Sequence, residues 1–223
     1  MPQLHEFRYP RESDEYRTAR NALLEAEQEH HRKTEELAKW RRALPPGGEV
    51  PEDYTFVDRS GGSVSILALF GPTHDTLVLY SFMYRAEGTP CPMCTVFLDG
   101  LNGNVPHLSS HVAIGAVAQA TPAELDAFAA ARNWDALQLL SCGGTGYGLA
   151  YGGEDNDANQ FPMLNVFRKS EDGVRDFYGT ELFFAPPEEG QHPRHMDPMW
   201  TLWNILDATL SGRPQEWWPQ LNC

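Results

Sequence analysis

The N-terminal segment has a pattern of apolar positions that is typical of an α-helix. Between Ser13 and Leu44 the chain contains neither Gly nor Pro, and apolar residues recur every three or four positions. Ser13 is followed by two acidic residues, which predicts a helix start, and the Pro-Pro-Gly-Gly run at 45–48 predicts its end. His30 and Lys33 interrupt the apolar stripe near its middle. The pattern therefore predicts one long helix with a thin apolar face.

This thin face leaves two interpretations for the helix. It packs either on its own domain or on a partner subunit, and in the second case Leu23, Leu37 and Trp40 meet a second copy of the chain in a homodimer. A solitary helix with so little apolar surface is marginal in water, so it has to pack against something. We treat residues 1–50 as a helical arm and residues 51–223 as a separate domain.

Beyond residue 48 the apolar pattern changes from helical to strand-like. The run Thr76–Tyr84 is almost continuously apolar, which indicates a strand buried on both faces, and Val112–Ala118 is a second such run. Thr121, Pro122 and Glu124 form a favourable helix start. Tyr54–Val57 and Val64–Phe70 are two short apolar stretches separated by Gly61-Gly62. Further elements are expected at Pro92–Leu101 and 122–134 (helices), Met163–Lys169 and Val174–Thr180 (a hairpin) and Asp197–Leu210 (a helix), with Gly143–Gly153 as a loop. Strands that alternate with helices predict an α/β domain.

Composition narrows the class of protein. A chain of 223 residues with 41% hydrophobic and 22% charged residues is typical of a globular protein whose core is stable without disulfides or bound metal ions. Its 17 basic and 31 acidic residues give a net charge of −14, so we expect neither a nucleic-acid nor a membrane partner. The start of the chain lacks the apolar core of a signal peptide, and no uncharged stretch is apolar enough to span a bilayer. We therefore expect a cytoplasmic protein.

Four cysteines are too few for a disulfide scaffold, and two of them form a CxxC motif, Cys91-Pro92-Met93-Cys94. The motif follows a buried strand and opens an expected helix, where free N–H groups and the positive end of the helix dipole stabilise a thiolate. Cys91 is therefore the expected nucleophile, and Cys94, one turn inward, is expected to resolve a mixed disulfide. The alternatives are two inert core cysteines or half of a zinc site. Cys142 is interpreted as a spare thiol, with an extra redox partner on a loop as the alternative, and Cys223 as a single thiol without a role.

The same cysteines also match the spacing of a zinc finger with two cysteines and two histidines, Cys91-x2-Cys94-x12-His107-x3-His111. Such a finger needs a small apolar core between its second cysteine and first histidine, and a helix that carries both histidines. Here that interval holds Gly, Asn and Pro residues, and the flanking runs are too apolar for a free-standing finger. We therefore expect no bound metal.

Several stretches resemble a known bacterial family. The helical lead-in ALLEAEQEHHRKTEELAKWRRALP, the runs VSILALF and LVLYSFMYR, and the block CPMCTVFLDGLNG are similar to a thioredoxin-like family catalogued as domain of unknown function 899, whose members are often labelled predicted dithiol-disulfide oxidoreductases. The resemblance covers about residues 13–180; Met93 and the Gly-rich segment 143–153 depart from it. It implies a thioredoxin-like fold, with a central mixed sheet flanked by helices and preceded by a long N-terminal helix. It also implies that Cys91 and Cys94 are the redox pair.

A thioredoxin-type site adds an expectation for Phe161-Pro162, which directly precedes the strand MLNVFRK. In such a site the proline is cis, lies beside the two cysteines, and leaves the preceding backbone free to pair with an extended substrate. The alternative is an ordinary proline at the first residue of a strand. We predict a cis bond, and we assign Phe161, Pro162, Pro92 and Met93 to the substrate-binding surface.

The favoured function is thiol–disulfide exchange at Cys91 and Cys94. It requires a disulfide or thiol substrate and an external reductant, but no organic cofactor. A first alternative is peroxiredoxin-like reduction of peroxide through a sulfenic acid on Cys91, which needs a nearby arginine; Arg85 is the nearest in sequence. A second alternative is a non-catalytic thioredoxin-fold module that binds a protein partner through its arm and acidic surface.

Overall fold

The computed structural model describes residues 4–186, 189, 197–214 and 217–221. Its internal contacts divide the chain into two units, residues 1–45 and residues 46–223. Within the described ranges, no helix combines the length and the apolar character that a membrane span needs.

The first unit is built around α1, Asp14–Arg42, which is the single long helix that the sequence predicts. Ser13 caps it, because the Ser13 hydroxyl oxygen accepts a hydrogen bond from the Tyr16 N–H at 3.1 Å. Arg17 in the first turn pairs with Glu12, which lies just before the helix, and both side chains are largely shielded from solvent. The start of the helix is therefore fixed by contacts within its own unit.

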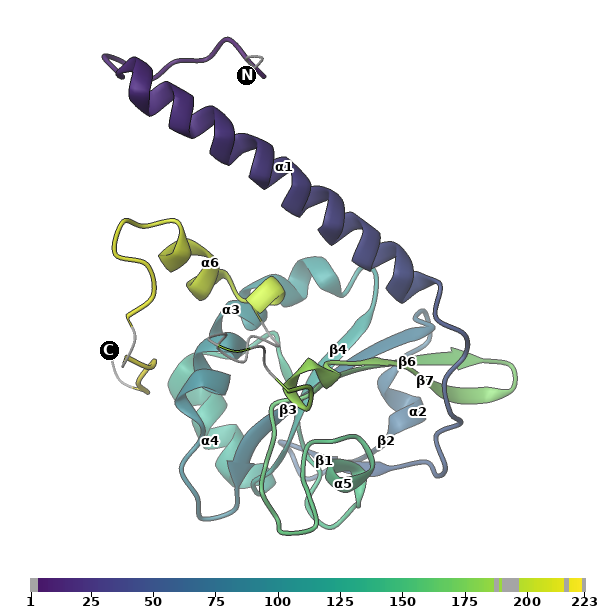
Figure 1. Ribbon diagram of the computed structural model, residues 1–223. Coiled ribbons are helices and arrows are strands. Elements are labelled where there is room, and N and C mark those ends of the chain that lie inside the picture. The colour runs from purple at the N-terminus through teal and green to yellow at the C-terminus, as the bar shows by residue number, and fades with distance from the viewer. Residues whose placement is uncertain (1–3, 187–188, 190–196, 215–216, 222–223) are drawn as a thin grey trace. The chain divides into compact units, whose positions relative to one another are not determined.

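The second unit contains a seven-stranded sheet (Figure 1). The strands are β1 (Thr55–Asp58), β2 (Ser63–Ser65), β3 (Thr76–Arg85), β4 (Ala113–Gln119), β5 (Gln138–Ser141), β6 (Leu164–Ser170) and β7 (Gly173–Gly179). Their order across the sheet is β2-β1-β5-β4-β3-β6-β7. The three central strands β5, β4 and β3 are parallel, and the two strands added at each edge are antiparallel to their neighbours. The sheet is therefore mixed, as expected.

The helices connect and cover these strands. They are α2 (Ile66–Leu69), α3 (Pro92–Leu108), α4 (Pro122–Arg132), α5 (Tyr147–Ala150) and α6 (Thr201–Asp207), with the 3₁₀ turns η1 (Glu181–Phe183) and η2 (Asp197–Met199). α3 links β3 to β4, α4 links β4 to β5, and the hairpin β6–β7 extends the sheet beyond β3. A parallel βαβ unit whose helix is opened by the two cysteines, followed by an antiparallel hairpin, is a thioredoxin-like arrangement. The expected fold class is confirmed.

The central strand β3 contributes side chains to two cores, one on each face of the sheet. Tyr80, Phe82 and Tyr84 belong to the core that contains α3 and α4, whereas Leu77 and Leu79 belong to the core that contains α2 and α5. Successive side chains of a strand point to opposite faces, and here both faces are covered. This double burial explains why the strand is a nearly continuous apolar run in the sequence.

The apolar stretch at 64–70 contains the end of β2 and the short helix α2, which begins where the Ser65 hydroxyl accepts the Ala68 N–H at 3.2 Å. Two local expectations are wrong. The segment 143–153 contains a helix, α5, which follows Gly146 in the left-handed region at φ +75°. The expected closing helix over 197–210 divides into η2 and α6. In addition, β5 is a strand that the sequence analysis did not anticipate, because four residues carry too little pattern.

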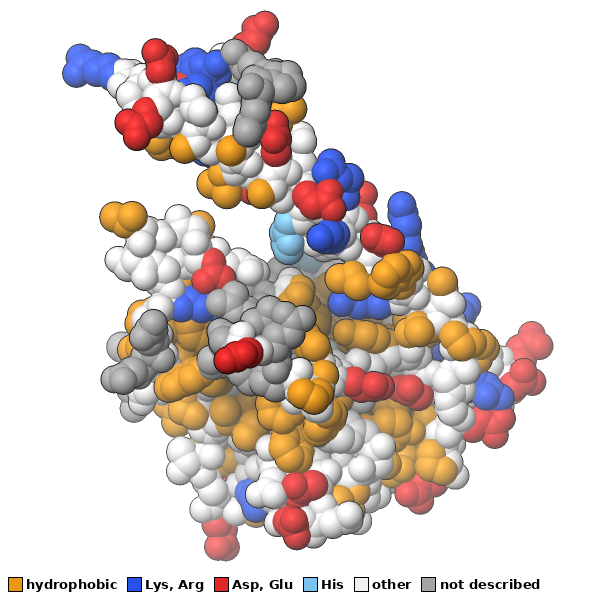
Figure 2. Space-filling view, viewed as in Figure 1, with side chains coloured by type: hydrophobic (Ala, Val, Ile, Leu, Met, Phe, Trp, Pro, Cys, Tyr) orange, Lys and Arg blue, Asp and Glu red, His pale blue; other side chains and the backbone are white. Residues whose placement is uncertain are grey.

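The exposed apolar residues of α1 provide a test of whether the arm joins two copies of the chain. Leu23, Leu37 and Trp40 are 53%, 47% and 61% exposed, and Figure 2 shows apolar atoms among charges of both signs along this helix. We expect sedimentation of the full-length protein to show a dimer. Replacing both Leu37 and Trp40 by Glu should give a monomer, because an unpaired charge is costly to bury.

The control for this prediction is Gln28→Glu, which adds one negative charge at an exposed position off the apolar stripe and should leave the dimer intact. A wild-type monomer whose arm nevertheless resists protease would show instead that the helix packs on its own domain.

Candidate redox site

The junction between β3 and α3 positions the first cysteine. Cys91 is the N-cap of α3, and Pro92 follows it in the first turn, where a missing N–H removes no helical hydrogen bond. The Cys91 N–H donates to Met83 O at 3.0 Å, and Cys91 O accepts the N–H and the hydroxyl of Thr95 at 3.0 and 2.9 Å. These bonds fix the first turn of α3. As a result Cys91 is half-buried, whereas Cys94 is enclosed in the core.

The start of the helix favours the thiolate form of Cys91. The neutral side chain makes no capping hydrogen bond, whereas the thiolate accepts hydrogen bonds from the Cys94 thiol and from the backbone N–H groups of Cys94 and Met93. The hydrogen bond from the Cys94 thiol has the largest effect, and together these bonds lower the pKa of Cys91 from 9.0 to about 6, although burial opposes them. At neutral pH Cys91 is therefore mostly a thiolate.

Cys94 is more deeply buried than Cys91, and its thiol is much less acidic. It is 2% exposed, and this burial is the main reason why its pKa lies well above the ordinary value. The hydrogen bond that it shares with Cys91, and the charge on Cys91, raise the pKa of Cys94 further. Both cysteines are free thiols in the structure. At neutral pH the reduced pair therefore carries one thiol proton, and this proton is bound to Cys94.

Tyr80 completes the site, and the sequence analysis did not identify it. It lies on β3, is buried, and its ring centroid is 4.8 Å from that of Phe97 on α3. Its hydroxyl forms a hydrogen bond with the Cys94 side chain that favours the thiolate of Cys94. Burial, above all, raises the pKa of Tyr80 well above its ordinary value, so Tyr80 keeps its proton and acts as a donor. In the sequence it is one aromatic residue in an apolar run, and no motif distinguishes it.

α3 extends to Leu108, beyond the predicted end at Leu101. Asn102 helps to stabilise the polar middle of the helix, because its side-chain oxygen accepts the N–H groups of Leu137 and Ala136 at 3.0 and 3.2 Å. This contact ties the helix to the chain just before β5. The Gly and Asn residues that suggested an early end of the helix are thus compensated by a tertiary contact.

The length of α3 excludes the zinc-finger pattern on geometric grounds. Cys94 and His107 lie on the same helix, thirteen residues apart. At 1.5 Å per residue this places them about 20 Å from each other along the helix axis. Two ligands of one tetrahedral ion lie within a few ångströms of it, so Cys94 and His107 do not bind the same ion.

Asp99, the acidic residue of the CPMCTVFLDGLNG block, attaches α3 to the end of α4. Its carboxylate accepts the Trp134 Nε1–H at 2.8 Å and pairs with Arg132. Trp134 is 1% exposed, so this hydrogen bond satisfies the polar group of a core residue. The acid of the block therefore has a structural role, in holding the helix that carries the cysteines.

The Phe161–Pro162 peptide bond is trans, so the prediction of a cis bond is wrong. The Phe161 N–H donates to Gly153 O at 3.0 Å, and the Met163 N–H donates back to Phe161 O at 3.1 Å, which closes a tight turn around Pro162. Met163 O then accepts the Ser81 N–H of β3 at 2.7 Å. The turn therefore joins the strand from which the cysteine helix starts, and it does so with an ordinary peptide bond.

The remaining residues assigned to substrate binding lie at two places. Pro92 and Met93 are half-buried in the first turn of α3, and Met93 packs against the core that contains Cys94. Phe161 packs edge-on against Phe183 and Phe184, with ring centroids 5.4 and 5.6 Å away. Their contact with a substrate stays a prediction.

Cys142 lies in the core on the other face of the sheet, among residues that surround α2 and α5. Burial raises the pKa of the Cys142 thiol to about 12, so it stays protonated at neutral pH. Cys223 lies outside the described residues. Of the cysteines that the structure describes, Cys91 therefore has by far the most acidic thiol.

Comparison with solved structures gives matches of low similarity. A hypothetical protein from Sinorhizobium meliloti is 16% identical, with 77% of this chain and 90% of that chain covered and a TM-score of 0.46. A peroxiredoxin-like protein from Aquifex aeolicus is 15% identical over 61% and 75%, with a TM-score of 0.42. A secreted disulfide oxidoreductase from Mycobacterium tuberculosis is 15% identical over 66% and 92%, with a TM-score of 0.40. Likeness at this level says nothing about activity.

Sequence comparison identifies the family. No curated protein matches the chain. A family model described as "Bacterial protein of unknown function (DUF899)" matches residues 8–222, a range that contains the cysteine pair, Tyr80 and Asp99. The motifs that suggested a resemblance thus belong to a match over almost the whole length, and the chain is a member of the DUF899 family of bacterial proteins.

Proposed function

We propose that this protein is a dithiol–disulfide oxidoreductase in which Cys91 is the nucleophile and Cys94 is the resolving thiol. The observation that supports this most is the opposite displacement of two pKa values across one hydrogen bond, downward at Cys91 and upward at Cys94. Burial alone raises the pKa of a thiol, as it does at Cys142. Exchange requires an attacking thiolate at neutral pH and a second thiol held in reserve, which is the arrangement present here.

The proposed reaction has two exchange steps. The Cys91 thiolate attacks one sulfur of a disulfide substrate, so that a mixed disulfide forms and the other substrate sulfur leaves as a thiolate that takes a proton from water. Cys94 then loses its proton and attacks the Cys91 sulfur, which forms the Cys91–Cys94 disulfide and releases the second substrate thiol. An external dithiol returns two electrons to the pair together with the one proton that Cys94 carries in the reduced form, and the second proton of the dithiol goes to water. We place this cycle in the cytoplasm, where such reductants are maintained.

Tyr80 assists the second step as a positioning residue. Cys94 has to become a thiolate inside the core, where burial opposes charge. The Tyr80 hydroxyl already forms a hydrogen bond with Cys94 that favours this thiolate. Tyr80 therefore acts through Cys94 and has no part in the attack of Cys91 on the substrate.

Peroxide reduction at Cys91 has weaker support. The arginine expected for it, Arg85, is exposed, and its charge acts on the carboxyl of Asp155, whose pKa it helps to lower. The effects that lower the pKa of Cys91 are all hydrogen bonds. We therefore propose disulfide exchange ahead of peroxide reduction.

Turnover measurements distinguish these functions. Reduced protein is incubated with insulin, or with hydrogen peroxide, in the presence of dithiothreitol, and the loss of each substrate is followed. We expect reduction of insulin, which Cys91→Ser should abolish. With dithiothreitol left out, Cys94→Ser should accumulate a mixed disulfide on Cys91, detected as an added mass on its peptide, because the resolving thiol is absent.

Cys142→Ser is the matched control for this experiment and should retain the wild-type rate. If the protein turns over peroxide but not insulin, its function is peroxide reduction and the proposal of disulfide exchange is wrong. Cysteines that never cycle with either substrate would leave a protein that binds partners without catalysis.

The pKa of Cys91 predicts how its alkylation depends on pH. The thiolate is the reactive form, so the rate with iodoacetamide should rise around pH 6, the pKa of Cys91, and level off about one unit above it. Cys94→Ala removes the largest stabilising hydrogen bond and should move the midpoint upward. Peptide mapping by mass spectrometry gives the rate at each cysteine. A midpoint near 9, the ordinary value for a cysteine, would contradict the assigned roles.

Removal of the Tyr80 hydroxyl should slow the resolving step alone. We expect Tyr80→Phe to prolong the lifetime of the mixed disulfide about tenfold, the effect of one hydrogen bond to a charged group. The alkylation profile of Cys91 should stay unchanged. Tyr84→Phe is the matched control, because Tyr84 is a buried tyrosine of the same core on the same strand. If Tyr80→Phe and Tyr84→Phe prolong the lifetime of the mixed disulfide equally, Tyr80 contributes only through packing.

A further inference from the structure

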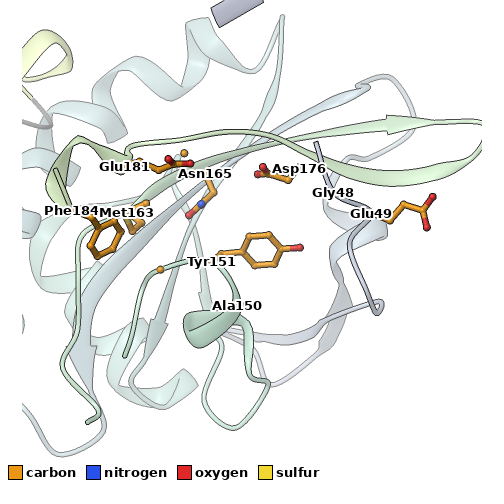
Figure 3. A pocket seen from close by; sticks show the side chains of 11 residues that line it. Gly48, Glu49, Ala150, Tyr151, Met163, Asn165, Asp176, Glu181 and Phe184 are labelled. Carbon is orange, nitrogen blue, oxygen red and sulfur yellow. The ribbon is translucent and has the colours of Figure 1, made fainter. Parts of the chain in front are cut away.

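A cavity of about 330 Å³ (Figure 3) lies on the face of the sheet that α5 covers, which is opposite α3. Its walls come from the chain before β1, from α5 and the loop after it, from β6 and β7, and from η1. The lining includes Tyr151, Met163, Asn165, Asp176, Glu181 and Phe184. None of them has a role in the proposed thiol chemistry, and the cavity is large enough for a small ligand.

Asn165 is a buried polar residue in the middle of this cavity wall. It is 4% exposed, and its backbone pairs with Leu79 of β3 and Gly179 of β7, so its position is fixed by the sheet. Its Oδ1 atom has no hydrogen-bond partner among the residues that the structure describes. Figure 3 shows the amide group directed toward the space between Met163 and Tyr151. Buried polar groups are nearly always paired, so this amide indicates a ligand.

Two carboxylates border the same space. Asp176 of β7 and Glu181 of η1 both line the cavity, and burial together with the charge of Glu181 raises the pKa of Asp176. A third acid, Glu49, is already neutralised, because its Oε1 lies 2.5 Å from Nη2 of Arg175. A cation bound beside Asp176 would offset the repulsion between Asp176 and Glu181, because it attracts both carboxylates.

The other walls are aromatic and apolar. The cavity is also lined by the aromatic residues Tyr151 and Phe184 and by Met163, whose side chain is a thioether. Gly152 has φ +71°, and a Cβ there would lie 3.3 Å from the Phe184 ring and 3.4 Å from the Met163 side chain, so a glycine is needed where these walls close. Aromatic faces beside a carboxylate suit organic cations, whereas hard metal ions need several oxygen ligands. No group of three or more metal-binding side chains occurs within the described residues.

We propose that this cavity binds a small organic ammonium compound that carries a second polar group. The ammonium group lies between the Asp176 carboxylate and the ring of Tyr151, and the polar group forms a hydrogen bond with the Asn165 amide. A half turn of that amide exchanges its oxygen and its NH₂ group, which have nearly the same shape, so Asn165 offers the ligand either an acceptor or a donor. The site does not depend on the thiol chemistry, because Cys91 lies on the other face of the sheet.

Calorimetric titration of the full-length protein at low salt tests the proposal. The probes are choline, ethanolamine and 3,3-dimethylbutan-1-ol, the last of which has the shape of choline but no charge. We expect at least one of the two cations to bind. The neutral alcohol should bind about tenfold more weakly than choline, or not at all, because it lacks the positive charge. Asp176→Asn should weaken binding of the cation about tenfold, because it removes the charge that faces the ammonium group.

Asp172→Asn is the matched control, since Asp172 is an exposed acid in the turn of the same β6–β7 hairpin and its loss changes the net charge equally. It should bind the cation as the wild type does. Asn165→Leu should abolish binding and raise the melting temperature, because it removes an unpaired buried oxygen. The proposal fails if neither cation binds, if the neutral alcohol binds as tightly as choline, or if Asp172→Asn and Asp176→Asn have the same effect.

Discussion

The hydrogen bond from the Cys91 N–H to Met83 O is the contact on which the arrangement of the candidate redox site depends. It starts α3 beside the end of the central strand, so that one cysteine caps the helix while the other, a turn later, enters the core. The same junction brings Cys94 against Tyr80, which lies three residues before Met83 on that strand. A single backbone contact thus determines which thiol meets solvent and which meets a buried hydroxyl.

The parts of this structure that are determined locally could be predicted from the sequence. The hydroxyl of Ser13 begins α1, and the capping box of Thr121 and Glu124 begins α4, because cap and helix are adjacent in the chain. The run of β3 shows its double burial directly. The position of Cys91 at a helix start also follows from a strand, a cysteine and a proline in succession.

The parts that depend on distant partners could not be predicted. Asn102 stabilises the second half of α3 only because the chain before β5 passes beside it. Tyr80 differs from the other aromatic residues of β3 through one contact with Cys94, which requires the packed helix. The Phe161–Pro162 bond has the trans form that is the default for X–Pro bonds, and hydrogen bonds within the loop and with β3, which a two-residue motif does not specify, fix the turn around it.

Under the proposed function, the contact between Tyr80 and Cys94 acts on the speed of exchange and leaves its equilibrium unchanged. Cys94 carries a proton in the resting reduced pair and would be bonded to Cys91 in the disulfide, so the buried Tyr80 hydroxyl faces a neutral, weakly accepting sulfur in both forms. Cys94 is a thiolate only in transit, before it attacks a mixed disulfide and when an external thiolate displaces it from the Cys91–Cys94 disulfide. A hydrogen bond that favours this thiolate therefore lowers the barrier for oxidation and for reduction alike.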